Sequence, residues 1–483
     1  MKRIYLDSNV FRKLKRDISE DSLYSKLLKS KDRLLFIYSH AHLLDLQQDK
    51  TNYKFDDLEF MENLVEDNYL SIPHKRQHAD LQLVTPRVAF DSIGTGYDLD
   101  DNLLNLESLF DFDGIDMTPE LEAAKEKLAR ALNTPLKLDI KSNIEKHQQG
   151  NTQAWEKLLP EIKDEYTMKE WFQVFSKMYS NLVTTDAYKE LRKNSMDSLQ
   201  LTTKFDIDIE DFSFDEDLKN TPINKSFLEL VDQSVSYNES AQTQYEYMYF
   251  ITAFNLLNIL GIDKEKNKKA VFVNTINDAQ HAFYGAHSDI VISDDEGFLL
   301  KSKVLYKLLG IETVTKNLDE FQNEYLAILG VTDISLNSYL EFLTYELSNS
   351  LIIDSQFDIN LDTDVVSYKT NNFHFGYFNR FDYFDLKEKG QQYVFYKEIA
   401  NYSRFHLYKE YEAITNKIYS LFKIDDNGRK EFSEVDVAEI KERKWKGRQW
   451  SLNKIHFILR KNYSNEEINF AIRIVQNTTD NML

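Results

Sequence analysis

The sequence predicts an α/β protein in which a parallel-sheet α/β/α core is split by a mainly helical insertion and followed by an α+β C-terminal domain. Three observations lead to this prediction. Short apolar runs alternate with helical apolar spacing in residues 1–75 and again in residues 240–325. Residues 76–239 combine helical spacing with acidic stretches. In residues 326–483 aromatic side chains often alternate along the chain, which is typical of a half-buried antiparallel sheet.

The first block alternates between strand and helix periodicity. Strands are expected over 2–6 and 34–38, and helices over 9–16, 21–28, 40–48 and 56–65. In the second block the apolar run 245–260 contains Glu246 and ends at Gly261, which favours a buried helix over a membrane span. The remaining expected elements are helices over 277–286 and 299–309 and strands over 289–293 and 311–315.

The tail has a different pattern. Helices are expected over 332–347 and 408–422, and the aromatic alternation between Tyr368 and Tyr408 predicts an aromatic-rich antiparallel sheet. Helices are also expected to close the chain.

Composition restricts the classes of function. The 483 residues contain 59 Lys and Arg against 80 Asp and Glu, giving a net charge of −21, and no cysteine. Without cysteine, disulfides, thiolate zinc sites, iron–sulfur clusters and cysteine nucleophiles are excluded, and a reducing cytoplasm is the expected location. The chain starts without an apolar leader and has no apolar run of membrane length, so no membrane association is expected. The negative charge argues against nonspecific coating of nucleic acid but allows a local basic groove.

Several carboxylates fall at or just beyond the ends of expected strands. Asp7 follows the first strand, Asp45 lies about two helical turns after the second, Asp278 opens a helix, and Asp294 and Asp295 follow a later strand. In an open parallel sheet such positions converge at the carboxyl edge. Each residue alone is more often a cap or a turn residue. Together they indicate a Mg²⁺ or Mn²⁺ site that could activate water at a phosphodiester.

Three segments resemble the PIN-domain nuclease family. Residues 4–10 resemble the opening strand and first acid of that family, and residues 39–46 resemble its second strand and helix, where the family usually has Glu and this chain has Asp45. Residues 278–295 resemble its most recognisable block, an acid on a helix followed by a strand ending in Ser/Thr-x-Asp. Residues 299–321 resemble its final helix and strand.

The resemblance implies a metal-dependent ribonuclease or, less often, a structure-specific DNA nuclease. It implies that Mg²⁺ or Mn²⁺ is bound by a catalytic quartet, with two neighbouring acids as alternates. The quartet is Asp7, Asp45, Asp278 and Asp295, and the alternates are Asp294 and Asp289.

Other polar residues near the expected site have two interpretations. Ser8, Asn9 and Ser293 could support the carboxylates by hydrogen bonds or act only as turn and cap residues. His281, and likewise His40 and His42, could contact the substrate, although surface or core histidines are commoner.

Two basic clusters are candidates for nucleic-acid binding. One is Arg12, Lys13, Lys15 and Arg16, and the other is Arg443, Lys444, Trp445, Lys446, Arg448 and Trp450. Lysine and arginine bind phosphates, and aromatic side chains can stack on bases. A solvated helix face with buried tryptophans is the favoured alternative for the second cluster.

The functional prediction is a metal-dependent endoribonuclease that acts as a toxin or phage-defence effector, an assignment of role that rests on analogy alone. The alternatives are a non-catalytic scaffold and a nuclease for flap or single-stranded DNA. RNA or single-stranded DNA is therefore the expected partner, while a regulatory partner protein and a homo-oligomer stay open. The acidic stretches 91–116 and 206–217 are either solvated loops, the favoured interpretation, or mimics of phosphate that restrain the nuclease.

Overall fold

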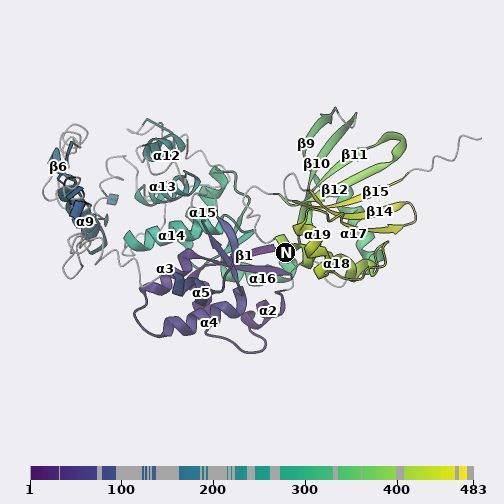
Figure 1. Ribbon diagram of the computed structural model, residues 1–483, viewed down its shortest axis with the longest axis horizontal. Helices are drawn as coiled ribbons and strands as arrows, with labels where there is room; N and C mark the ends of the chain where they lie inside the picture. Colours follow the sequence, from purple (N-terminus) through teal and green to yellow (C-terminus); the bar gives the residue numbers. More distant parts are fainter. Residues whose placement is uncertain are drawn as a thin grey trace, which may run out of the picture.

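A computed structural model of the 483-residue chain is drawn in Figure 1. It describes residues 2–31, 33–72, 79–93, 133–137, 163–184, 224–236, 245–260, 272–329, 335–359, 362–398, 407–462 and 467–475, together with single residues and pairs between 122 and 219. Most of the expected insertion, including nearly all of both acidic stretches, lies outside these residues. None of the described helices combines the length and apolar character that crossing a membrane requires.

The first described sheet joins the two sequence blocks. Its order is β4-β3-β2-β1-β7-β8, with only β4 antiparallel to its neighbour. The strands are β1 (Lys2–Leu6), β2 (Leu34–Ser39), β3 (Asn68–Ser71), β4 (Asp80–Leu83), β7 (Ile290–Ile292) and β8 (Val314–Lys316). Tyr5 of β1 pairs with Ile37 of β2 on one side and Val291 of β7 on the other. Residues nearly 290 positions apart therefore form one mixed α/β unit, as the alternation predicted.

Helices cover both faces of this sheet because its central strands are apolar on both sides. Tyr5 packs with one cluster and its neighbours Ile4 and Leu6 with the other. On the Tyr5 face lie α12 (Phe227–Ser236), α13 (Tyr245–Ile259), α14 (Phe272–Gly285) and α15 (Glu296–Leu308). On the Ile4 face lie α1 (Ser8–Leu14), α2 (Leu23–Lys29), α4 (Tyr53–Val65), α5 (Pro86–Ser92) and α16 (Leu318–Leu329). The α3 helix (His40–Gln48) contributes Ala41 to one cluster and Leu43 to the other.

Several boundaries differ from the sequence prediction. The sheet continues past residue 75, because β4 pairs with β3. Helix α14 begins at Phe272 instead of residue 277, so Asp278 lies inside the helix and does not open it. Residues 227–236, which were assigned to the insertion, form α12 and pack in the core through Phe227 and Val231.

The second large sheet is antiparallel, with the order β13-β14-β15-β12-β11-β10-β9 (Figure 1). Its strands are β9 (Leu351–Asp358), β10 (Thr363–His374), β11 (Phe378–Asp385), β12 (Gln391–Tyr396), β13 (Arg448–Leu452), β14 (Ile455–Asn462) and β15 (Glu467–Ile474). One face packs against α17 (Leu336–Asn349), α18 (Leu407–Phe422) and α19 (Glu434–Lys441). The expectation of closing helices was wrong: the chain closes with β13, β14 and β15, whose buried residues include Trp450, Phe457 and Phe470, and in β14 buried Phe457 and Leu459 alternate with less buried positions.

Buried ionic contacts join the two sheets at the amino ends of β1 and β7. The Arg3 guanidinium lies 3.1 Å from the Glu410 carboxylate of α18. The Lys397 ammonium, just after β12, lies 2.7 Å from the Asp289 carboxylate, which precedes β7. Arg3 also donates its backbone N–H to Asp289 at 2.8 Å. The C-terminal sheet is thus attached to the edge opposite the predicted site.

Candidate active site

Asp7 connects the ends of two parallel strands. It follows β1 and begins α1, where its Oδ1 accepts the Ser8 backbone N–H at 2.7 Å. Its Oδ2 accepts a hydrogen bond from Asn9 Nδ2 at 2.6 Å and from the Ser293 hydroxyl, beyond β7, at 2.6 Å. Burial raises the pKa of Asp7, although the charge of His281 and these hydrogen bonds oppose the shift. Of the two interpretations left open for Ser8, Asn9 and Ser293, the structure agrees with contact to the carboxylate, which Ser8 makes through its backbone N–H.

Asp45 of α3 binds two side chains of α14. Asn277 Nδ2 donates to its Oδ1 at 2.7 Å, and His281 Nε2 lies 3.0 Å from its Oδ2. Burial alone would raise the pKa of Asp45, but the charge and hydrogen bond of His281 outweigh it and lower that pKa. Asp45 is therefore an anion already paired with a histidine in this arrangement.

His281 is a buried bridge between the acids. Its side chain is 3% exposed, and its Nδ1 lies 2.7 Å from the Tyr5 hydroxyl and 3.9 Å from Asp7 Oδ1. Burial alone would lower its pKa, but Asp45 and then Asp7 outweigh this effect, so the pKa of His281 is raised. A protonated His281 between two carboxylates reduces their repulsion. His281 therefore positions the acids, and because its side chain is almost fully buried it has little surface for contact with a substrate.

His42 belongs to the same buried network. Its Nε2 lies 2.7 Å from the Leu6 carbonyl and its Nδ1 accepts the Ser39 backbone N–H at 3.0 Å. These contacts indicate a neutral ring protonated on Nε2. Burial lowers the pKa of His42 to about 3, which agrees with that state. His42 therefore holds β2 and β1 together at their carboxyl ends, and His40 is partly buried beside it.

Asp278 is the least compensated acid of the site. It lies in α14, one turn before His281, and makes no hydrogen bond or salt bridge with another described residue. Burial raises its pKa to about 7; Lys301 opposes the shift, while Asp7 and Asp295 add to it. Asp7 and Asp295 therefore lie close enough to Asp278 for their charges to affect its ionisation. Such a group of carboxylates favours binding of either a proton or a cation.

Asp295 follows β7 and begins α15. Its Oδ1 accepts the Phe298 backbone N–H at 2.9 Å, and its own N–H donates to the Ser293 hydroxyl at 3.0 Å. Asp295 therefore acts as a helix cap, and its other carboxylate oxygen has no hydrogen bond with the described residues. Through Ser293 it shares a hydrogen-bond network with Asp7.

The two alternate ligands lie in other environments. Asp294 binds Lys13 Nζ at 2.9 Å and accepts the Leu318 N–H at 3.3 Å. Asp289 precedes β7 and binds Lys397 at the opposite end of that strand. Four residues of extended chain separate Asp289 from Ser293, or about 13 Å. The structure therefore does not place Asp289 with the other carboxylates, and that assignment was wrong.

The donor set of the site consists of hard oxygen ligands. Carboxylates of this kind suit Mg²⁺ or Mn²⁺, and a cation would relieve the repulsion that raises the pKa of Asp278. In the present side-chain arrangement, however, the described residues contain no group of three or more His, Asp or Glu positioned to hold a metal ion. The chemistry of the donors fits the ion, and ligation would require the carboxylates to turn toward one another.

The first basic cluster lies beside these acids, on α1 and the residues after it. Lys13 pairs with Asp294, and Lys15 pairs with Asp57 of α4 at 2.6 Å. Arg12 and Arg16 are exposed and form no hydrogen bond or salt bridge with the described residues. Half of the predicted cluster is therefore available for an anion.

Of the two interpretations of the second basic cluster, the structure confirms the favoured one in that both tryptophans are buried, although they lie in β13 and the loop before it instead of on a helix. Trp445 and Trp450 are each only 2% exposed, and Arg448 is 5% exposed. Trp445 Nε1 donates to Asp436 Oδ1 at 2.8 Å, and Arg448 forms an ion pair with the same carboxylate. These side chains belong to the core of the C-terminal sheet, so they cannot stack on bases or bind phosphate. Only Arg443, Lys444 and Lys446 are exposed.

Sequence reasoning missed several residues of the network. No role at the site was assigned from the sequence to Tyr5, Asn277, Lys301 or Asp57. Asn277 adjoins Asp278 in the sequence, which was the one available signal.

Comparisons of the chain with family models, with curated proteins and with solved structures find no match.

Proposed function

We propose that the chain is a divalent-metal-dependent endoribonuclease of the PIN-like kind, with its reaction centre at Asp7, Asp278 and Asp295. The observation that carries this proposal is the hydrogen-bond network at the carboxyl ends of β1 and β7, where the Ser293 hydroxyl donates to Asp7 and accepts the backbone N–H of Asp295. Asp278 of α14 lies close enough for the charges of Asp7 and Asp295 to add to the burial that raises its pKa to about 7. Such a centre is energetically unfavourable without a bound cation or proton. The sheet also unites the two sequence blocks that resemble the family.

The chain's own residues would prepare this centre. Mg²⁺ or Mn²⁺ held by Asp7, Asp278 and Asp295 would supply an activated water and charge stabilisation at the phosphodiester. Asn9 and Ser293 fix the orientation of the Asp7 carboxylate. His281 and Asn277 hold Asp45 as an anion. Because both of its carboxylate oxygens are engaged by these side chains, Asp45 would orient His281 and would not be a free metal ligand.

Arg12 and Arg16 supply positive charge next to the acids, which would attract the phosphate backbone. The buried ammonium of Lys301 limits the negative charge at Asp278. Both effects favour an anionic substrate that the net charge of the whole chain would otherwise repel.

A non-catalytic scaffold is the second candidate. Asp45 is engaged by His281 and Asn277, and no metal-holding group exists among the described side chains as they are placed. A protein that retained this fold only for binding would require no further rearrangement of its carboxylates.

Cleavage of structured RNA, single-stranded DNA and flap DNA with Mn²⁺ separates these candidates. Because loss of an outer partner of a metal ligand typically costs about 10–100-fold, Asp7→Asn should lower metal-dependent cleavage by about a hundredfold or more. Asp56→Asn, which changes an exposed acid of α4, is the matched control and should cleave like wild type. Equal metal-dependent rates for wild type and Asp7→Asn would contradict the site assignment, and absence of cleavage by wild type would favour the scaffold.

A further inference from the structure

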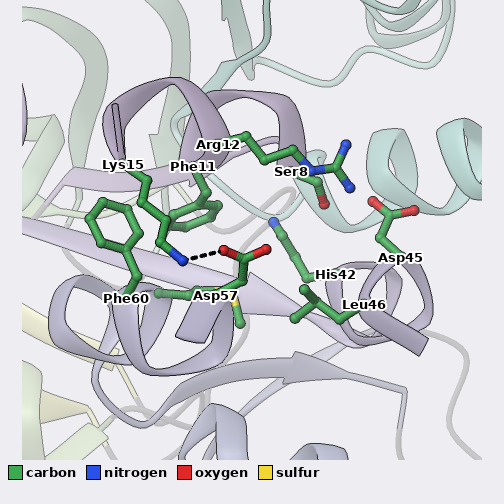
Figure 2. Close-up of a pocket in the computed structure, with 10 residues that line it drawn as sticks. Ser8, Phe11, Arg12, Lys15, His42, Asp45, Leu46, Asp57 and Phe60 are labelled. Carbon is green, nitrogen blue, oxygen red and sulfur yellow. Dashed lines mark hydrogen bonds and ion pairs between the residues drawn. The ribbon is translucent and has the colours of Figure 1, made fainter. Parts of the chain in front are cut away.

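The pocket nearest the acids is too small for a further ligand. Figure 2 shows that Asp45, Phe11 and Phe60 line it, together with the ion pair of Lys15 and Asp57. Its volume is about 30 Å³, which is room for about one water molecule. A larger partner would need an open surface, and the described residues offer one at the outer edge of the C-terminal sheet.

The outermost strand of that sheet, β9, exposes many apolar side chains. It ends the strand order, and β10 is its only partner among the described strands (Figure 1). Every residue from Leu351 to Phe357 is exposed. Five large apolar side chains of this region are exposed by 44–85%, and they are Leu351, Ile352, Ile353, Phe357 and Ile359. Apolar side chains gathered on a surface in this way are typical of a site that binds another protein.

The free edge of β9 is longer than that of the other outer strands of the two large sheets. β9 has eight residues, whereas β4, β8 and β13 have four, three and five. An outer strand carries backbone N–H and C=O groups without a strand partner, and proteins usually protect such an edge by short strands, by Lys or by Pro. β9 contains neither Lys nor Pro. Its pairing with β10 shifts register at Ile353 and is regular from Asp354 to Asp358, so five consecutive residues present an even edge.

Charge selects the kind of partner that this edge can bind. Asp354 and Asp358 lie on β9, which has no basic residue, and the exposed Asp364 lies beside them on β10. The nearby Lys387 is paired with Asp362 at 2.5 Å. Pairing with the same strand of a second copy would place two aspartates of each chain on one ladder without a base, and like charges across strands are destabilising. The edge is therefore complementary to a basic segment and not to itself.

The two faces of β9 specify the sequence pattern of the partner. Side chains of a strand alternate between its faces, so Asp354 and Asp358 project from one face and Phe357 from the other. Alternate residues of an added strand would therefore lie beside the aspartates and beside Phe357. We propose that β9 binds an extended segment of a partner protein as an additional strand, in which lysine or arginine alternates with apolar residues. This binding concerns the C-terminal sheet alone and is independent of the proposed nuclease activity.

Peptide binding to the full chain, measured by fluorescence anisotropy, tests this proposal. The probe is a fluorescent peptide in which lysine alternates with valine, and a control peptide of the same charge has proline in place of its central valine. Because proline cannot donate a hydrogen bond to the ladder, the control peptide should bind at least about tenfold more weakly. Equal binding of the two peptides would show attraction by charge alone and would overturn the proposal.

Two pairs of variants locate the bound peptide. Asp354→Lys should weaken binding of the lysine–valine peptide by about 2–30-fold, and should bind a glutamate–valine peptide instead, because it replaces an attractive cross-strand pair with a repulsive one. Asp56→Lys, at an exposed acid of α4, controls for net charge and should have a much smaller effect. Phe357→Ser should also weaken binding, whereas Leu83→Ser, at a similarly exposed residue of the outer strand β4, should not.

Unchanged binding by both Asp354→Lys and Phe357→Ser would overturn the proposal, and so would absence of binding by wild type. These positions are exposed, so the variants should fold as wild type does. Light scattering measures the mass of the chain in solution, which neither substitution should change. A wild-type dimer that Phe357→Ser converts into a monomer would show that a second copy occupies the edge and would contradict the proposed partner.

Discussion

Asp278→Asn is expected to stabilise the metal-free protein at pH 8 while removing its activity. The pKa of the Asp278 carboxyl is raised from 3.8 to about 7, first by burial and then by Asp7 and Asp295. The folded state therefore binds the Asp278 proton more tightly than the unfolded state does. Above pH 7 the ionised Asp278 carboxylate lowers the free energy of unfolding. This destabilisation declines as the pH falls from 7 to about 4 and is absent below pH 4. Asparagine carries no charge, so it avoids the cost at every pH.

The shift corresponds to about 2–4 kcal/mol at pH 8, where the carboxylate is ionised in both states. Urea unfolding in the presence of a chelator should show this gain at pH 8 and little or none at pH 4. Asp56→Asn is the control for the general effect of removing a negative charge from the acidic chain, and it should change stability by much less. A loss of stability at pH 8 on Asp278→Asn would show that the carboxylate is compensated by a group other than those identified.

The same substitution should lower metal-dependent cleavage about as much as Asp7→Asn does. An active-site acid is expected to reduce the stability of the protein and yet to be required for the reaction. Mn²⁺ should also raise the stability of wild type more than that of Asp278→Asn, because a ligand that binds the folded state stabilises it. Equal stabilisation of both proteins by Mn²⁺ would place the ion elsewhere.

The parallel part of the fold could be predicted because each strand is short, apolar and followed by a helix with clear periodicity. The segments 2–6 and 34–38 correspond closely to β1 and β2, and the run 245–260 corresponds to α13. The closing strands could not be predicted in the same way. The basic residues of 448–474 do not mark one face of a strand, because Arg460 is exposed while Arg448 is buried, and such a basic run resembles a solvated helix face as closely as an amphipathic strand.

The carboxylates of the site could be predicted from the sequence because Asp7 and Asp295 directly follow the ends of short apolar strands. Their partners were not, since tertiary contacts bring Tyr5 to His281 across 276 positions. Asp289 was misassigned for a related reason: proximity in sequence to Asp294 hides the fact that a strand has two ends. Burial of Trp445 and Trp450 was the favoured expectation, but the partner of the Trp445 ring nitrogen, Asp436, is set by the assembled core and could not be predicted.

Asp289→Asn should have the opposite effect to Asp278→Asn, lowering stability and sparing the reaction. Burial alone would raise the pKa of Asp289, but the charge and hydrogen bond of Lys397 outweigh it and the pKa is lowered. A carboxyl with a lowered pKa in the folded state stabilises the protein above its unfolded pKa and loses that contribution as the pH falls through the folded value. The stabilisation by Asp289 is therefore present at neutral pH and lost in acid.

At pH 7 the substitution removes the carboxylate charge 2.7 Å from an ammonium whose side chain is only 5% exposed. Breaking a buried ion pair from one side costs about 3–5 kcal/mol, so a loss of roughly 3 kcal/mol is expected in urea unfolding. Lys397→Met should cost a similar amount, and the double variant should cost less than the sum, because the second change removes the charge that the first left buried.

Cleavage measured at a temperature where both variants stay folded distinguishes this pair from the reaction centre. Asp289→Asn should keep a rate close to wild type, since the Lys397 contact and the acids lie at opposite ends of β7. A hundredfold loss of activity in folded Asp289→Asn would contradict this assignment and would indicate that Asp289 is a metal ligand. Additive losses in the double variant would instead show that Asp289 and Lys397 act independently. Stability and activity thus move in opposite directions for two aspartates 11 positions apart, because one lies among acids and the other beside a buried lysine.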